Sequence, residues 1–438
     1  TAPAWHLFAV FVSAIACVLI GSFPLLTASM IAVATVVLTG TLTPAQAFSG
    51  FANASVLLVV IAFIVAQAVV KSGLGRRISL LMVSRFGGSP LGLAYSLVLT
   101  DAAIAPAFPS NTARGGVLFP IVLSISKGAG SEPDSPEGRR LGGYLMFCAM
   151  AGLSVSSALW LTATSCNPIG VQIAQQHGME IGFADWLIAS SVPTLSAILI
   201  LPLLVAKIFP PGIGATPEAP IAARRDLAGM GAMSRDERIT LVTFAVMVAG
   251  WVAGSALQIN GTAVAFMGFG VLLVSGVLTL EDISKQGDTL TTFLWLAILF
   301  ALSAQLNELG FMGYVGERLA TRMGGLDWPV LYVALVALYV VLHYFFVSQT
   351  SQMLALLAVF LDVGIRGGVP AALMAPGLLF ASSYFSVITP QGGSQNIIFV
   401  ASGYLKQGEL YRMGLITTIT FMTIYLVIGT PWILFVSG

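Results

Sequence analysis

The chain has 438 residues, of which 57% are hydrophobic and 8% are charged, and its formal net charge at pH 7 is +1. An ordinary soluble domain does not have this composition, so the sequence predicts an all-α polytopic membrane protein. The near-zero net charge gives no indication of a nucleic-acid or acidic partner, and we expect the lipid bilayer and small solutes as contacts.

Ten apolar stretches are long enough to cross a bilayer, because a spanning helix needs roughly 20 residues. In chain order they cover residues 5–22, 23–40, 54–71, 142–165, 189–208, 239–257, 262–279, 289–306, 370–403 and 413–436.

Two other stretches, residues 88–126 and 327–363, run apolar, polar, apolar, and each apolar half is too short to cross a bilayer alone. We expect each to be a re-entrant hairpin that enters and leaves on one side. Residues 75–86 and 312–324 mix charged with apolar residues, which predicts helices in the membrane interface. Residues 210–238 are expected to be a solvated linker.

The two halves of the chain are related by a duplication, because matching residues recur at offsets that drift only from 236 to 238. The matches are Gly40, Leu42 and Thr43 with Gly276, Leu278 and Thr279 (offset 236), Gly87-Gly88 with Gly324-Gly325 (237), and Ser110 and Thr112 with Ser348 and Thr350 (238). Each copy holds five crossings and one hairpin. Since five is odd, the second copy must be inverted relative to the first.

Basic residues are unequally shared between the two sides of this topology. Of the 19 Lys and Arg residues, Arg114 lies inside the first hairpin, three (Arg318, Arg322 and Arg366) fall on one side, and the remaining 15 fall on the other. The positive-inside rule predicts that the side with 15 is cytoplasmic. The first hairpin then opens inward and the second opens outward.

Polar residues interrupt the apolar sequence at four places. The hairpin tips carry Ser110-Asn111-Thr112 and Ser348-Gln349-Thr350, and residues 162–170 and 388–396 each place a proline beside polar residues. Non-helical backbone at membrane depth persists only where it is buried in protein or lines a cavity. Four such breaks at matched positions predict one pocket near the midplane, built from two hairpins and two broken helices.

The predicted pocket suits a small dianion, because half-helix N-termini carry partial positive charge and unpaired N–H groups. Hydroxyl and amide side chains would add hydrogen-bond donors. The predicted substrate-binding residues are Ser110, Asn111, Thr112 and Arg114 of the first hairpin, Ser348, Gln349 and Thr350 of the second, and Thr164, Asn167, Thr389 and Pro390 of the two further breaks.

Two titratable residues near the tips have alternative interpretations. Arg114 is the cation expected at membrane depth, and it is either a fixed positive charge beside the substrate or one half of a structural ion pair with Asp101. His343, five residues before Ser348, either mirrors Arg114 or relays protons, or is a hydrogen-bonded core residue.

The motif Pro109-Ser110-Asn111-Thr112-Ala113-Arg114, the run Tyr344-Phe345-Phe346-Val347-Ser348-Gln349-Thr350 and the early Ala4-Trp5-His6-Leu7-Phe8-Ala9 resemble the divalent anion:sodium symporter family. The likeness is greatest to its 2-oxoglutarate/malate translocator and citrate or tartrate/succinate antiporter branch. It implies a homodimeric elevator-type transporter of di- or tricarboxylates in a bacterial inner (plasma) membrane.

The same resemblance implies how the chain divides. A scaffold domain would comprise residues 1–86 and 239–325, and a transport domain residues 87–209 and 326–438, joined by a cytoplasmic linker at 210–238. Relatives usually carry one more helix upstream of the first predicted crossing.

Departures from the sodium-coupled members bear on the coupling. Those members usually repeat Ser-Asn-Thr in the second hairpin, where this chain has Ser348-Gln349-Thr350, and Pro106 and Tyr344 stand where sodium-ligating oxygens are expected. We therefore expect sodium-independent antiport with no cofactor and no resident metal, because an empty carrier with unpaired buried groups crosses slowly. The alternative is a sodium- or proton-coupled symporter, in which Ser110, Asn111 and Ser348 would hold the cation.

Two other classes fit the residues less well. A membrane-embedded enzyme would need a catalytic cluster, but the sequence has no HExxH motif and its histidines, His6, His177 and His343, are scattered. An anion channel would need a continuous pore, and saturation with counterflow would distinguish a carrier from it.

Overall fold

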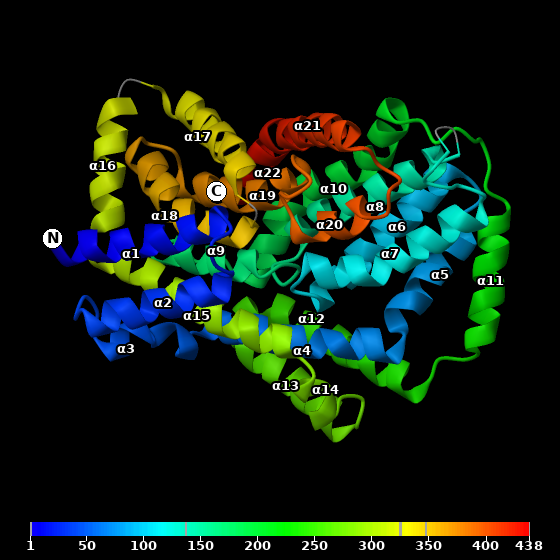
Figure 1. Cartoon of the computed structure of the whole chain (residues 1–438), viewed down its shortest axis with the longest axis horizontal. Helices are drawn as coiled ribbons and strands as arrows, with labels where there is room; N and C mark the ends of the chain where they lie inside the picture. Colours follow the sequence, from blue (N-terminus) through cyan, green and yellow to red (C-terminus); the bar gives the residue numbers. More distant parts are fainter. Residues whose placement is uncertain (1, 136–137, 324–325, 347, 438) are drawn as a thin grey trace.

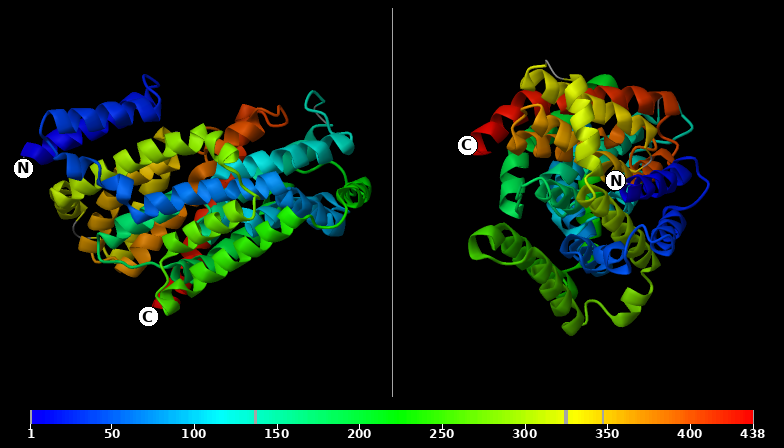
Figure 2. Two further views of the ribbon diagram at one scale, coloured as in Figure 1. Left: turned by 90° about the horizontal axis from the view of Figure 1, so that it is seen from below. Right: turned by 90° about the vertical axis from the view of Figure 1, so that its left-hand side faces the viewer.

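The computed structural model describes residues 2–135, 138–323, 326–346 and 348–437. Within these ranges all regular secondary structure is helical. Figure 1 shows helices from both halves of the chain intermixed in one bundle, with the N-terminus at one end of the long axis and α11 at the other. The views of Figure 2 show α1 and α2 together on the outside of this bundle.

The ten predicted crossings each correspond to a helix. These helices are α1 (Ala2–Leu19), α2 (Leu25–Leu38), α4 (Ala54–Ser72), α8 (Arg140–Leu159), α10 (Phe183–Ile208), α12 (Arg235–Leu257), α13 (Gly261–Val274), α15 (Gly287–Glu308), α19 (Ala371–Tyr384) and α21 (Gln407–Ile424), which continues through a π-helical turn (Tyr425–Gly429) into α22 (Thr430–Ser437). The other helices are α3 (Pro44–Ala47), α5 (Leu74–Phe86), α6 (Pro90–Ile104), α7 (Asn111–Gly128), α9 (Cys166–Gln175), α11 (Glu218–Met230), α14 (Leu280–Ser284), α16 (Phe311–Met323), α17 (Trp328–Leu342), α18 (Gln349–Arg366) and α20 (Ser394–Val400).

Helix lengths differ from the prediction at two kinds of position. Eight helical segments of the described chain are long and apolar enough to span a membrane, and the segments with α1, α2, α13 and α19 are shorter. The first arms of the two hairpins are among the eight, because a 3₁₀ turn extends each to 18 residues, Pro90–Ala107 and Trp328–Phe345. The expectation that every hairpin half is too short to cross is therefore wrong for these two arms, by length alone.

The sequence repeat has a structural basis at the ends of α2 and α13. Gly40 and Gly276 both adopt positive φ, +69° and +77°, which glycine allows without a side-chain clash. Thr43 and Thr279 then cap the short helices α3 and α14, each in a reciprocal capping box. Gly324 and Gly325, the predicted matches of Gly87 and Gly88, lie outside the described residues.

The two hairpin tips repeat each other in backbone and in capping. Ser110 (φ −145°, ψ 119°) accepts a hydrogen bond from the Ala113 amide at 3.2 Å, and so begins α7. Ser348 (φ −148°, ψ 126°) accepts one from the Ser351 amide at 3.3 Å and begins α18. The serines that mark the repeat in the sequence are therefore N-caps of the second hairpin arms.

The linker differs from the expected solvated loop, because residues 218–230 form α11, which lies along the edge of the molecule in Figure 1. Buried Arg77 of α5 fixes its end: Nη1 donates to the Gly231 carbonyl at 2.9 Å, and Nε donates to Glu237 at 2.6 Å. A cation at the C-terminus of a helix stabilises its unpaired carbonyls. This tertiary contact stabilises a helix that the local sequence does not predict.

Candidate functional site

The four predicted breaks lie in contact with one another. The first tip touches the first break, where the Ser165 amide donates to the Pro109 carbonyl at 3.0 Å and Thr162 Oγ1 donates to the Pro106 carbonyl at 2.9 Å. The second tip touches the second break, where His343 Nε2 lies 2.6 Å from the Gly392 carbonyl. Each tip is therefore packed against the broken helix of its own repeat.

Contacts also cross between the repeats. Thr112 Oγ1 of the first tip lies 2.5 Å from Ser394 Oγ of the second break. Thr350 Oγ1 of the second tip lies 3.0 Å from Cys166 Sγ of the first break. Each hairpin tip therefore contacts both broken helices, so the four interruptions form one connected cluster.

The predicted site residues differ in accessibility. Thr112 is exposed, and Ser110, Ser348 and Pro390 are half-buried. The others are buried: Asn111, Arg114, Thr164, Asn167, Gln349, Thr350 and Thr389. An entering ligand would meet the serine caps and Thr112 first. The binding roles of all these residues stay predictions.

Arg114 points away from this surface into the protein. Its side chain is fully buried, and Nη1 lies 2.7 Å from Asp101 Oδ2. Nη2 donates to Asn111 Oδ1 at 2.6 Å and to the Ala163 carbonyl of the first break at 3.4 Å. The geometry is that of the ion-pair alternative, and the guanidinium reaches the pocket through Asn111.

Two serines complete the surroundings of Arg114 and were missed by the sequence interpretation. Ser156 and Ser157 are buried in α8 and accept hydrogen bonds from the guanidinium at 2.7 and 2.5 Å. The available signal was the pair of adjacent serines inside a predicted crossing of the same repeat as Arg114, the cation expected at membrane depth. They join the hairpin to α8, which is buried along almost its whole length.

His343 is a buried, hydrogen-bonded residue stacked on Phe385 at 4.0 Å. Nδ1 lies 2.6 Å from Gln352 Oε1, and Gln352 Nε2 donates to the Tyr339 carbonyl at 2.7 Å. Both ring nitrogens thus lie within hydrogen-bonding distance of oxygen atoms, as expected of the core-residue alternative. At the offset of 238 that relates the tips, Gln352 corresponds to Arg114 (352 − 114).

A symmetric pair of asparagines holds the two broken helices. Asn167 and Asn396 each begin a second half-helix and donate from Nδ2 to two carbonyls at the end of the first half. The bonds are Asn167 to Ser157 (2.8 Å) and Trp160 (3.0 Å), and Asn396 to Ser386 (2.7 Å) and Thr389 (3.0 Å). All three positions correspond at one offset, 229 (386 − 157, 389 − 160, 396 − 167).

Asn396 was absent from the predicted site. The offset of 229 differs from the 238 that relates the hairpin tips, so the two asparagines do not align when one offset is used throughout. Their Oδ1 atoms are buried and have no hydrogen-bond partner among the described residues. Each of these two asparagines, which we call the braces of the broken helices, therefore leaves one acceptor oxygen available to a donor or a cation.

The described residues contain no group of three or more His, Cys, Asp or Glu side chains that could hold a metal ion. The three residues suggested as sodium ligands are engaged in other bonds. Ser110 and Ser348 cap helices, and Asn111 Oδ1 accepts from Arg114 and from Ser157. A sodium ion on Asn111 Oδ1 would lie beside a guanidinium, which is electrostatically unfavourable.

Comparisons with known proteins agree with this architecture. The family model described as the sodium:sulfate symporter transmembrane region matches residues 1–437. The putative malate transporter YflS of Bacillus subtilis (strain 168) is 37% identical over 98% of this chain and 90% of its own length. The chloroplastic dicarboxylate transporter 2 of Spinacia oleracea is 35% identical over 99% of this chain and 78% of its own length.

A solved structure has the same fold. The YdaH transporter of Alcanivorax borkumensis superposes with a TM-score of 0.62 at 18% identity, covering 90% of this chain and 88% of that one. The predicted fold class, a helical polytopic protein with an inverted repeat, hairpins and broken helices, is confirmed.

Proposed function

Because this chain belongs to the sodium:sulfate symporter family, whose members are membrane transporters and not enzymes, we propose that it exchanges one small dicarboxylate for another without sodium. Two relatives are named for malate or dicarboxylate transport. The proposed substrate class is di- or tricarboxylates, of which 2-oxoglutarate, malate, succinate, tartrate and citrate are the candidates.

The observation that carries the antiport proposal is the 2.6 Å bond from Arg114 to Asn111 Oδ1. Asn111 Oδ1 is the oxygen that a coupling sodium would need. It already accepts two hydrogen bonds, one from Ser157 and one from the permanently charged Arg114. Arg114 is neutralised by Asp101, so its part in this proposal is to occupy and orient Asn111 and not to add net charge. Without a dianion the pocket keeps unpaired donors, and desolvating these is costly. Return of the empty carrier should therefore be slow, which favours exchange.

The two tips supply a natural site for each end of a dicarboxylate. Each presents a serine cap, a neighbouring threonine and the positive N-terminus of an 18-residue helix, α7 or α18. One carboxylate would meet Ser110 and Thr112, and the other Ser348 and Thr350. A substrate with a single carboxylate would leave one tip unpaired.

Movement is proposed to follow an elevator scheme in a homodimer. The scaffold would comprise residues 1–86 and 239–325, and the transport domain residues 87–209 and 326–438. The protein would lie in a bacterial inner membrane with its basic loops cytoplasmic, as the distribution of Lys and Arg suggests.

Two ion pairs support this division, because each joins two distant stretches on the same side of it. They are Lys71–Asp282 (2.6 Å) for the scaffold and Arg139–Glu409 (2.7 Å) for the transport domain. A third pair, Arg77–Glu237 (2.6 Å), joins the scaffold to the last residues of the linker. Breaking Lys71–Asp282 or Arg139–Glu409 would separate parts that must move as one body.

The test is uptake of labelled succinate or 2-oxoglutarate into proteoliposomes, with and without internal dicarboxylate and with and without a sodium gradient. Uptake should require internal dicarboxylate and ignore sodium. Thr112→Val should raise KM about tenfold or more, since a hydrogen bond to a charged ligand is lost. Thr423→Val is the matched control, because this exposed α21 hydroxyl bonds only within its own helix. Uptake into empty vesicles would overturn antiport.

A second candidate is symport with sodium or protons, favoured by the unpaired buried Oδ1 atoms of Asn167 and Asn396. Two acceptor oxygens without donors are suited to a cation or a proton carried on the substrate. Net uptake that follows a sodium or proton gradient into vesicles without dicarboxylate would establish it.

A further inference from the structure

A cavity of about 980 Å³ lies between α7 and a wall formed by α4, α5 and α11. Its lining on α7 recurs every three or four residues, from Ala113 through Val117, Ile121 and Ser124 to Gly128, which is one face of the helix. The cavity thus follows α7 for roughly 22 Å, at 1.5 Å per residue. It begins one residue beyond Thr112 of the proposed pocket and ends where the basic loops begin.

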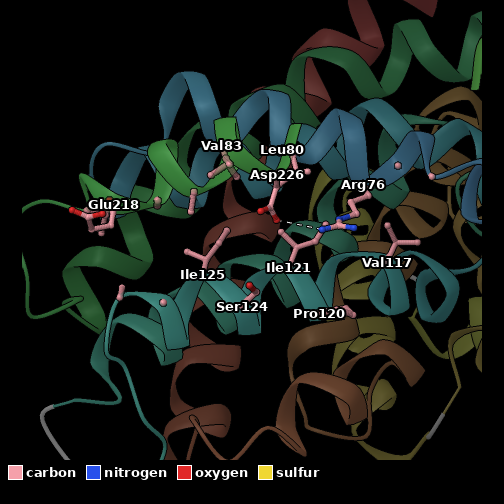
Figure 3. Close-up of a pocket in the computed structure, with 18 of the residues that line it drawn as sticks. Arg76, Leu80, Val83, Val117, Pro120, Ile121, Ser124, Ile125, Glu218 and Asp226 are labelled. Atoms are coloured by element: carbon pink, nitrogen blue, oxygen red, sulfur yellow. Dashed lines mark hydrogen bonds and ion pairs between the residues drawn. The ribbon is translucent and has the colours of Figure 1, made fainter. Parts of the chain in front are cut away.

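Three charged residues, Arg76, Asp226 and Glu218, line the opposite wall. Figure 3 shows Arg76 pointing toward Asp226 beside Ile121, and Glu218 at the other end of the cavity. Arg76 belongs to the helix expected in the membrane interface, and Asp226 and Glu218 belong to the linker expected on the cytoplasmic side. The charged wall therefore faces the aqueous side of the protein, which favours a cavity filled with water.

The pair of Arg76 and Asp226 is loose and accessible. Arg76 Nη2 lies 3.3 Å from Asp226 Oδ2, and the two side chains are 60% and 41% exposed. The neighbouring Arg77 is different, because its side chain is 10% exposed and bonds Glu237 at 2.6 Å. Exposed pairs are weak and exchange partners readily, so Arg76 is available to another anion and Arg77 is not.

We propose that this cavity is the water-filled route between the pocket and the side with the basic loops, and that Arg76 captures the dicarboxylate within it. The capture role rests on the proposed function. Val117, five residues beyond Thr112, lies against Gly75, the residue before Arg76, so Arg76 lies in the part of the cavity that is nearer to the pocket. A dianion displaces Asp226 because it carries twice the charge, and Asp226 reclaims Arg76 once the substrate moves on. Asp226 thereby prevents the capture site from retaining its ligand.

Cysteine labelling tests the route without reference to any substrate. Cys148 and Cys166 are buried, so Ser124→Cys in a Cys17→Ser background places one reactive thiol in the cavity. A charged, membrane-impermeant maleimide added from the basic-loop side should label it. Val271→Cys, exposed on apolar α13, is the control that should stay unlabelled. No labelling of Ser124→Cys, as expected of a lipid-filled cavity, would overturn the route.

Transport from each side tests the capture residue. With substrate on the basic-loop side, Arg76→Gln should raise KM about 3- to 10-fold, as expected for an exposed charge pair with a dianion. Asp226→Asn should lower KM on that side. Neither should change KM from the opposite side, and both effects should shrink in 1 M salt, where the screening length is about 3 Å.

The matched control is Arg225→Gln, which removes an exposed charge of α11 outside the cavity lining. Equal effects of Arg76→Gln and Arg225→Gln, or equal KM changes from both sides, would overturn the capture role. Wild-type vesicles that do not exchange dicarboxylates would instead refute the proposed function, while the labelling result still decides the route.

Discussion

Replacing Arg114 by glutamine should destabilise the protein by about 3–5 kcal/mol, the usual cost of removing one partner of a buried ion pair. Arg114 and Asp101 are 0% and 1% exposed, and their charged atoms lie 2.7 Å apart. The variant leaves the Asp101 carboxylate buried with the Ser156 hydroxyl as a donor but with no positive charge beside it. Unfolding by SDS in mixed micelles measures the loss.

A second substitution separates the ion pair from the function of Arg114. Adding Asp101→Asn removes the stranded charge, so the double variant should recover most of the lost stability and show a coupling energy of about 2 kcal/mol or more. Its exchange activity should nevertheless stay low, because Asn111 Oδ1 has lost the guanidinium that orients it. The double variant is therefore expected to be nearly as stable as the wild type and yet to transport poorly.

Two results would refute this reasoning. A double variant no more stable than Arg114→Gln would mean that the buried charge of Asp101 does not cause the loss. A stable double variant that exchanges dicarboxylates at the wild-type rate would mean that Arg114 does not act on the pocket through Asn111.

Three further predictions concern the braces, an ion pair and a close contact. Asn167→Ala and Asn396→Ala should each cost about 1–3 kcal/mol in unfolding free energy, and by similar amounts, since each strands two carbonyls. The Lys71 hydrogen bond lowers the pKa of Asp282 to about 2, so this half-exposed pair contributes above pH 4 and is lost as the pH falls through 2. Asp282→Asn should thus cost under about 1 kcal/mol between pH 5 and 8. Gly414→Leu should impair folding and exchange, because a Cβ there would clash with the carbonyl oxygen of Val387, directly before the second break.

Each of these predictions has a contradicting outcome. Very different costs for the two asparagines would argue against equivalent braces. A stability gap between wild type and Asp282→Asn that widens on acidification has the wrong sign for a carboxylate with a lowered pKa. Gly408→Ala, in open space at the start of α21, should behave as wild type, and a matching loss there would make the Gly414 result uninformative about the contact.

Local signals predicted much of the fold, because the features that interrupt helices are local. The serine caps Ser110 and Ser348 begin α7 and α18. Pro168 and Pro390 lie in the two breaks because they stand beside polar residues, whereas a proline in apolar surroundings, such as Pro376, lies inside a helix. Positive-φ glycines such as Gly40 lie at helix ends. These features gave the crossings, the hairpins and the breaks, and the duplication gave their pairing.

The features that the sequence did not predict depend on how the helices are rotated relative to one another. The rotation of α7 against α6 and α8 decides whether Arg114 faces the pocket or Asp101. The sequence does not predict this rotation, because the residues between α6 and α7 are not helical and their spacing does not fix how the two helices are turned. Helix α11 is stabilised by Arg77, which lies far away in the sequence. Its own residues carry no strong helix signal, and the segment was therefore predicted to be a linker. Asn396 escaped notice because the broken helices repeat at a different offset from the hairpin tips.

The most direct test of the central claim is the stoichiometry of exchange in sodium-free proteoliposomes. Vesicles loaded with one labelled dicarboxylate receive another with a different label, and both fluxes are counted. The account predicts one molecule out for each molecule in. Uptake that exceeds efflux, or that proceeds at the same rate with nothing inside, would contradict an obligatory exchanger.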